Sequence, residues 1–227
     1  MKISLVILTM NEINGVKKLV PMIDKTKFYE VICIDGNSTD GTQEELRKQK
    51  IPYFVQKLKG LGGAVIEARK QAKGDAILFF HPDGNCDISD LDTFIKYFDM
   101  GHEFIVASRN IKGASNEEDM QLLKSRKWAG LLMAFLDNLL FGTKYGRCTD
   151  PMNGYRGITK AAFNKMKLTV TDASVDQQMI IRSKKNGVSL VEFPTKEGNR
   201  IGGETKFHFF DTGYTHGKLL LREFLFR

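Results

Sequence analysis

The stretch AILFFHPDGNCD, residues 76–87, joins an apolar run to a polar turn, and the same arrangement recurs along the chain. Its first five residues are all apolar, which is typical of a strand buried on both faces of a parallel sheet. Similar runs occur at Ile3–Leu8, Glu30–Ile34, Tyr53–Val55 and Phe104–Ala107. Segments that suit helices lie between them, at Gly15–Lys25, Gly41–Lys50, Gly63–Ala72 and Leu91–Phe98. This alternation predicts an α/β domain with a mainly parallel sheet.

The chain after about residue 110 has a different pattern. Neither an internal repeat nor a low-complexity tract marks a second domain, so we expect residues 1–227 to form one domain. The segments expected there are a charged stretch (Lys112–Lys127), a mostly apolar segment (Trp128–Phe141), a Gly-rich loop (Gly142–Gly157), a helix near Ala173–Lys185, a strand near Ser189–Phe193 and a basic Gly-rich loop (Gly198–Lys206).

The composition is that of an ordinary globular protein. Of its 227 residues, 42% are hydrophobic and 27% charged, which excludes the disordered, collagen-like and disulfide-rich classes. The 34 Lys and Arg residues outnumber the 27 Asp and Glu residues, so the net charge is +7 and a polyanionic partner is expected. Aromatic residues are not interleaved with the basic ones, which argues against nucleic acid. The three cysteines lie far apart, which indicates a reducing compartment and no zinc site.

Polar residues and glycines follow the predicted strands, where ligands of parallel sheets bind. Asp35 ends the second run and can accept hydrogen bonds from a ribose or a base. Gly60 and Gly62 precede a helix, so backbone N–H groups there can approach a phosphate or a sugar. Their spacing matches neither a P-loop nor GxGxxG, which weakens a kinase or dehydrogenase interpretation.

The turn HPDGN, residues 81–85, is a candidate metal site. His81, Asp83 and Asn85 alternate along the chain, so in an extended segment their side chains point to one side. One nitrogen and two oxygen ligands suit a divalent cation. An ordinary polar turn is the alternative, because Pro82-Asp83-Gly84 is favourable turn chemistry.

Seven segments, in order, resemble the family 2 glycosyltransferases of GT-A fold, and most closely the polyprenyl-phosphate (dolichol-phosphate) hexosyltransferase branch. They are SLVILTMNE (4–12), IDGNSTDGT (34–42), KGLGGAVIEA (59–68), HPDGNCD (81–87), ASR (107–109), DPMNGYR (150–156) and NRIGGETK (199–206). The resemblance implies a Rossmann-like sheet flanked by helices, in which residues 1–109 bind a nucleotide-sugar. Residues 110–227 would supply helices and loops on the acceptor side.

The resemblance also implies roles for individual residues. Those expected to bind the nucleotide-sugar are Thr9, Asn11, Glu12, Asp35, Gly60, Gly62, Pro82 and Asp83. A Mn²⁺ or Mg²⁺ ion is expected on His81, Asp83 and Asn85, although His81 stands where the family usually has an aspartate. Residues expected to bind an acceptor phosphate are Arg109, Arg200, Lys206 and either Arg126 or Lys124.

The implied activity is inverting, metal-dependent transfer of a hexose from a UDP- or GDP-sugar to a polyprenyl phosphate. An acceptor phosphate oxygen is already anionic, so it needs no base. It needs positively charged groups such as Arg109 and Arg200 to hold it in place. A sugar hydroxyl as acceptor would instead need a carboxylate base, for which Asp150 and Asp176 are the candidates. The predicted catalytic residues are therefore Asp83, Asp150, Asp176, Arg109 and Arg200. Alternatives are transfer to a glycan or glycolipid hydroxyl and a noncatalytic nucleotide-sugar-binding protein.

Two segments resemble sequences that lie in a bilayer interface: Trp128–Phe141, with basic residues before it, and KLLLREFLFR, residues 218–227. A core helix and a docking helix are the alternatives. No apolar run reaches the roughly 18 residues of a membrane span. We therefore expect a cytoplasmic protein that binds the cytosolic face of a membrane peripherally. A homo-oligomer or a separate membrane-anchor subunit is the further partner expected.

Overall fold

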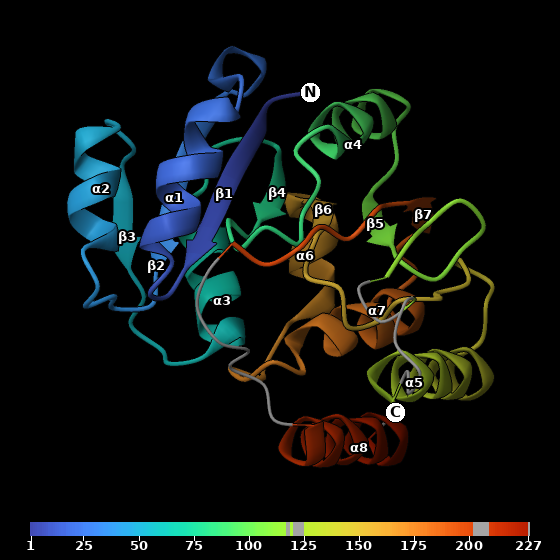
Figure 1. The fold of residues 1–227 in the computed structure, drawn as a ribbon. Coiled ribbons are helices and arrows are strands. Elements are labelled where there is room, and N and C mark those ends of the chain that lie inside the picture. Colours follow the sequence, from blue (N-terminus) through green and yellow to red (C-terminus); the bar gives the residue numbers. More distant parts are fainter. Residues whose placement is uncertain (117–118, 120–124, 202–208, 227) are drawn as a thin grey trace.

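The computed structural model of the protein describes residues 1–116, 119, 125–201 and 209–226 (Figure 1). Its centre is a seven-stranded sheet with the strand order β3-β2-β1-β4-β6-β5-β7. The strands are β1 (Ile3–Thr9), β2 (Glu30–Asp35), β3 (Tyr53–Val55), β4 (Ala76–Phe80), β5 (Phe104–Ser108), β6 (Arg156–Thr159) and β7 (Leu190–Pro194). Strands β1 to β4 run parallel to one another, and so do β5 and β7, which confirms the predicted mainly parallel sheet.

Strand β6 corrects the sequence analysis, which assigned all of Gly142–Gly157 to a loop. Its first residue, Arg156, pairs antiparallel with β5, and the next, Gly157, pairs antiparallel with both β4 and β5. Only four residues long, β6 lacks an apolar run, and its neighbours supply the hydrogen bonds that make it a strand. A Cβ at Gly157 would lie 2.7 Å from the ring of Phe98, so a glycine is needed for α4 to pack there.

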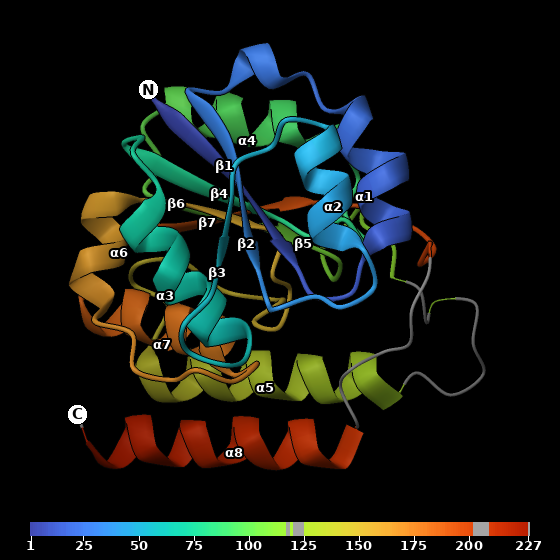
Figure 2. The same ribbon diagram turned by 90° about the vertical axis from the view of Figure 1, so that its left-hand side faces the viewer.

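Helices cover both faces of the sheet (Figures 1 and 2). They are α1 (Ile13–Leu19), α2 (Thr42–Lys48), α3 (Leu61–Gln71), α4 (Asp90–Asp99), α5 (Ser125–Phe141), α6 (Lys160–Met166), α7 (Val175–Lys185) and α8 (Phe209–Leu225), with short 3₁₀ turns η1 (Val20–Met22) and η2 (Lys25–Lys27). The helix expected over Gly15–Lys25 ends at Leu19, because Pro21 has no N–H to continue the helical hydrogen bonds.

Two apolar cores fill the space between the sheet and its helices. Alternate residues of β1 divide between them: Leu5 and Ile7 pack with α1, α2 and α4, whereas Val6 and Leu8 pack with α3, α6 and α7. The strands are therefore apolar on both faces, as the continuous runs predict. This three-layer arrangement brings the carboxyl ends of β1, β2 and β4 to one edge of the sheet.

Helices α5 and α8 lie side by side as an outer layer against α7 (Figure 2). Only Ala134 and Asp137 of α5 are buried, so Trp128–Phe141 is not a core helix. Large apolar side chains are exposed on both helices: Trp128, Leu131, Leu132, Phe135 and Leu139 on α5, and Tyr214, Leu221, Phe224 and Leu225 on α8. Within the part of the chain that the structure describes, no helix is both long and apolar enough to span a membrane.

Candidate active site

Two adjoining pockets lie at the carboxyl edge of the sheet. The strand-end pocket, of about 430 Å³, is lined by residues that follow β1 and β4 together with the start of α3. The helix-side pocket, of about 310 Å³, is lined by residues between β5 and α7 and by α5 and α8. Both are within the size range of ligand sites. They share His81, Asp83 and Arg200 and the α8 residues Thr212 and His216, so together they form one continuous site.

The structure brings most of the predicted nucleotide-sugar residues to the strand-end pocket. Its lining includes Thr9, Glu12, Gly60, Pro82 and Asp83. A Cβ at Gly60 would lie 2.4 Å from the backbone oxygen of Thr171, and the residue has a φ of +86°, so both the space and the backbone require glycine. Gly62 contacts the same 170–171 segment rather than the pocket, and it allows α3 to start there.

Asn11 and Asp35 support the walls of this pocket without lining it. The buried Asp35 carboxylate accepts hydrogen bonds from Thr9 Oγ1 at 2.9 Å, from Ser38 N at 2.8 Å and from Gln43 Nε2 at 2.7 Å. Asn11, with a φ of +55°, donates its backbone N–H to Ser38 Oγ. Both residues tie the loop after β1 to the loop after β2, and their predicted contact with a nucleoside stays a prediction.

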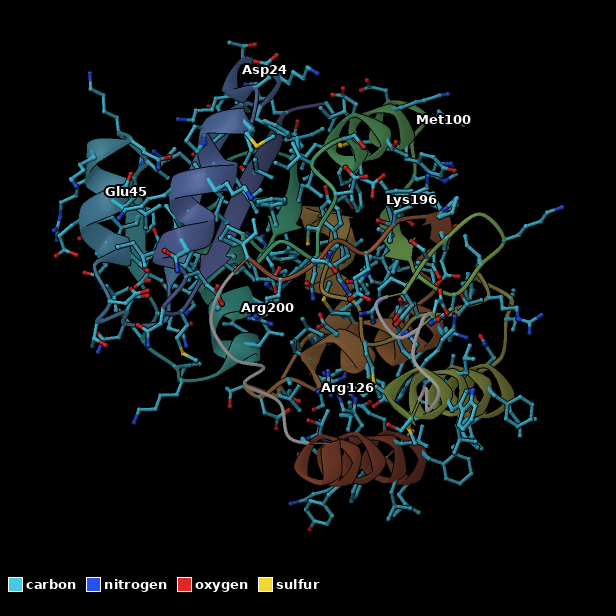
Figure 3. All side chains as sticks on the ribbon, in the orientation of Figure 1. Asp24, Glu45, Met100, Arg126, Lys196 and Arg200 are labelled. Atoms are coloured by element: carbon cyan, nitrogen blue, oxygen red, sulfur yellow. The ribbon has the colours of Figure 1, made fainter. Side chains whose placement is uncertain are left out.

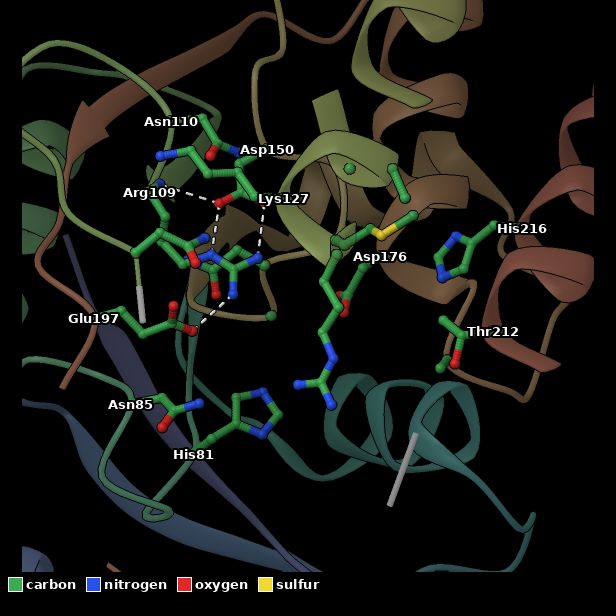
Figure 4. Close-up of a pocket in the computed structure, with 18 of the residues that line it drawn as sticks. His81, Asn85, Arg109, Asn110, Lys127, Asp150, Asp176, Glu197, Thr212 and His216 are labelled. Carbon is green, nitrogen blue, oxygen red and sulfur yellow. Dashed lines mark hydrogen bonds and ion pairs between the residues drawn. The ribbon is translucent and has the colours of Figure 1, made fainter. Parts of the chain in front are cut away.

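The candidate metal ligands His81, Asp83 and Asn85 all line the helix-side pocket, where Figure 4 shows His81 beside Asn85. Asp83 Oδ1 accepts the backbone N–H of Asn85 at 3.0 Å, and Asp83 Oδ2 lies 3.7 Å from Arg200 Nη1. Asn85 Oδ1 is buried with no hydrogen-bond partner. An orphaned amide oxygen beside a carboxylate and an imidazole fits a divalent cation. No group of three or more His, Cys, Asp or Glu side chains among the described residues forms a metal cluster by itself.

Arg109 lies in the helix-side pocket but is already paired with two carboxylates (Figure 4). Its Nε and Nη2 donate to the two oxygens of Asp150 at 2.8 and 3.0 Å, and Nη1 donates to Glu197 at 2.8 Å. Burial lowers the pKa of Arg109, but the two carboxylates outweigh it, so the pKa is raised and the guanidinium stays charged. Its predicted contact with an acceptor phosphate therefore competes with a buried ion-pair cluster.

Arg126 and Arg200 also line the helix-side pocket, on the same side of the molecule (Figure 3). Arg200 Nη2 donates to Glu12 at 3.1 Å, which links the two pockets through one guanidinium. Three of the predicted phosphate-binding residues thus meet in one pocket. Lys206 and Lys124 lie outside the described residues.

The two candidate bases differ in their surroundings. Both oxygens of Asp150 accept from Arg109, so this carboxylate is poorly placed to take a proton. Asp176, at the start of α7, lines the same pocket, where burial raises its pKa and Arg156, at 3.4 Å, opposes the rise. Asp176 is thus the better-placed proton acceptor of the two.

Glu197, Thr212 and His216 also line the helix-side pocket and were not predicted from the sequence. Glu197 directly precedes the basic Gly-rich loop, and this position was the only available signal. Thr212 and His216 are isolated residues of an amphipathic segment, and nothing in their spacing distinguishes them from residues of an ordinary surface helix.

Comparison with known proteins agrees with the fold. The family model "Glycosyl transferase family 2" matches residues 4–167. The dolichol-phosphate mannosyltransferase of Pyrococcus furiosus is 27% identical over 214 residues, which cover 91% of this chain and 59% of that protein. Glycosyltransferase AglJ of Haloferax volcanii is 24% identical over 188 residues, covering 82% of this chain and 60% of the relative. The chain thus spans about 60% of the length of these relatives.

A solved structure shares the fold. Glucosyl-3-phosphoglycerate synthase from Mycobacterium tuberculosis, crystallised with Mn²⁺, UDP and glucosyl-3-phosphoglycerate, aligns with a TM-score of 0.72 at 16% identity over 98% of this chain and 80% of that one. This likeness confirms the expected GT-A fold. Since the family model covers more than half of the sequence, the chain belongs to glycosyl transferase family 2.

Proposed function

We propose that this protein transfers a hexose from a UDP- or GDP-sugar to a phosphorylated acceptor, a polyprenyl phosphate in the first instance, with inversion at the anomeric carbon. The observation that carries the proposal is the continuity of the two pockets. Asp83 and Arg200 stand in both, so a donor in the strand-end pocket and an acceptor in the helix-side pocket would meet beside them. Attack from the side opposite the leaving group inverts the sugar carbon.

The donor would lie in the strand-end pocket, with its diphosphate directed toward His81, Asp83 and Asn85. These three side chains would hold a divalent cation, and a bound Mn²⁺ or Mg²⁺ supplies positive charge that stabilises the departing nucleoside diphosphate. Relatives support this assignment, because solved structures of the same fold were crystallised with Mn²⁺ or Mg²⁺ and UDP.

A phosphate is the favoured acceptor group because of the bases that the helix-side pocket offers. Asp150 is held by Arg109, which leaves Asp176, buried beside Arg156, as the better-placed base of the two. A phosphate oxygen needs no base, and Arg126 and Arg200 supply positive charge in the same pocket. Transfer to a sugar hydroxyl through Asp176 is the alternative function, and the dolichol-phosphate names of curated relatives favour the phosphate.

A lipid-borne acceptor requires contact with a membrane surface, and the exposed faces of α5 and α8 suit it. Both helices border the helix-side pocket and carry exposed aromatic and leucine side chains. A helix with such a face can lie in the interface plane. We propose peripheral attachment at the cytosolic face of a membrane, stabilised by self-association or by an anchor subunit.

The proposal is tested with a panel of UDP- and GDP-sugars, with Mn²⁺ or Mg²⁺, assayed for donor hydrolysis and for transfer. Metal-stimulated release of nucleoside diphosphate is expected from one donor. Asp83→Asn should abolish that stimulation, whereas Asp92→Asn, the same change on an exposed carboxylate outside both pockets, should not. Tight nucleotide binding without any turnover would instead support a noncatalytic nucleotide-sugar-binding protein.

A further inference from the structure

Three buried polar side chains form a hydrogen-bonded chain that links helices α5, α7 and α8. The chain ends where the two pockets meet. Asp137 of α5 accepts a hydrogen bond from Gln177 Nε2 of α7 at 3.0 Å. Gln177 Oε1 lies 2.9 Å from Nδ1 of His216 on α8. All three residues are at most 2% exposed. The chain lies outside the predicted donor, metal and phosphate residues, and the mechanism above does not use it.

The chemistry of the chain fixes which nitrogen of His216 carries the proton. A carboxylate oxygen only accepts, so Asp137 Oδ1 orients the Gln177 amide with its NH₂ group toward α5. The Gln177 carbonyl then faces His216, and Nδ1 must be the donor. Burial raises the pKa of Asp137 to about 7, so this carboxyl group can carry a proton near neutral pH. A proton on the unpartnered Oδ2 leaves Oδ1 an acceptor, and the directions of the hydrogen bonds along the chain stay the same. Nε2 of His216 is therefore the nitrogen with a lone pair.

His216 is a neutral group in this position. Burial lowers its pKa to about 4, and the charge of Asp172 offsets only part of that effect. A neutral imidazole with a fixed Nδ1 proton offers a hydrogen-bond acceptor at Nε2 and no positive charge. A phosphate has acceptor oxygens and little to donate, so this nitrogen suits a hydroxyl group instead.

The position of the ring identifies the molecule that would present the hydroxyl. His216 lines both pockets, together with Asp83 and Arg200 (Figure 4). The hexose being transferred must lie between the diphosphate in the strand-end pocket and the acceptor in the helix-side pocket. Among the described residues, Gln177 is the hydrogen-bond partner of the ring, which leaves Nε2 for a ligand at this junction.

We propose that His216 Nε2 accepts a hydrogen bond from a hydroxyl of the transferred hexose and so helps to select the sugar. Asp137 and Gln177 are positioning residues that hold the required tautomer. The inference rests on the proposed function and adds a recognition element for the sugar itself. One hydrogen bond of this kind is worth about ten-fold in kcat/KM.

The first experiment compares the preferred donor with its monodeoxy analogues, one for each ring hydroxyl. The protein should lose about ten-fold in kcat/KM with one analogue, and His216→Phe should lose the same with the natural donor and nothing further with that analogue. His102→Phe, on a histidine that packs against Tyr97 outside both pockets, should keep the full discrimination. Equal discrimination by His216→Phe and the unchanged protein across all analogues would overturn the inference and leave the proposed function intact.

A second experiment does not need turnover or a folded variant. In ¹⁵N-labelled protein, the imidazole of His216 should carry its proton on Nδ1, and its Nε2 resonance should move when a nucleotide-sugar and Mg²⁺ are added. Nucleoside diphosphate and Mg²⁺ alone should leave that resonance in place. The opposite tautomer, or an equal shift with both ligands, would overturn the role of His216, whereas failure of every nucleotide-sugar to bind would overturn the proposed function.

Discussion

Replacing Arg109 by methionine separates two roles for this residue, an ion-pair centre and a phosphate ligand. In the structure, three charge-assisted hydrogen bonds of 2.8–3.0 Å connect it to Asp150 and Glu197. The carboxylate side chains are only 3% and 4% exposed, whereas that of Arg109 is 22% exposed. Arg109→Met removes these three hydrogen bonds and their positive charge from two buried carboxylates.

The cost follows from these exposures. Removing one partner of a buried ion pair costs about 3–5 kcal/mol, and the partial exposure of Arg109 places this case near 3 kcal/mol. In urea unfolding followed by far-UV circular dichroism, with a slope near 3 kcal/mol/M, the midpoint should fall by about 1 M. Adding Asp150→Asn and Glu197→Gln removes the buried charges and should recover part of the loss.

The matched control is Lys27→Met. Lys27 pairs with Asp92 at 2.7 Å, but the two side chains are 42% and 62% exposed, so its loss should leave the urea midpoint almost unchanged. A loss below about 1 kcal/mol in Arg109→Met, with a raised KM for the acceptor, would refute the ion-pair interpretation and assign Arg109 to the ligand.

Three further variants test other parts of the site. Arg200→Ala should reduce transfer to the acceptor about 10- to 100-fold more than donor hydrolysis, and equal losses would assign Arg200 to the donor or the fold. Burial raises the pKa of Asp137 to about 7, so between pH 4 and 7 the folded protein keeps a proton that the unfolded chain has released, and the free energy of unfolding should fall as pH rises through this range. Asp137→Asn should flatten this fall, and a variant with the same pH profile as the original protein would argue against a buried acid. Phe135→Glu, on the exposed face of α5, should weaken sedimentation with anionic vesicles, whereas Met22→Glu, on an equally exposed side chain elsewhere, should not; equal sedimentation of the two would remove α5 from the membrane contact.

The sheet was predictable to within a residue or two wherever a strand is buried on both faces. The predicted strand Ala76–Phe80 has the same bounds in the structure, because a run of five apolar residues between two turns is too short for a typical helix and favours a buried strand. Strand β6 was not predictable, since Arg156 and Gly157 belong to it only through the strands beside them. Local sequence does not report hydrogen bonds that distant strands supply.

The site divides in the same way. That His81, Asp83 and Asn85 line one pocket could be predicted, because they lie within five residues of one another; that they bind a metal stays a prediction. The pairing of Arg109 with Asp150 spans 41 residues of chain, so its geometry depends on the assembled sheet. His216 belongs to the site only because α8 packs against α7.

The proposed reaction is transfer of a hexose to a lipid phosphate. Its most direct test uses the donor with a radiolabelled sugar, Mn²⁺ or Mg²⁺ and a short-chain polyprenyl phosphate, followed by extraction into organic solvent. Label in the organic phase that requires both the metal and the lipid phosphate, and that is lost in Arg200→Ala, is the expected result. Label that appears only on a glycan acceptor, with none in the organic phase, would contradict the claim.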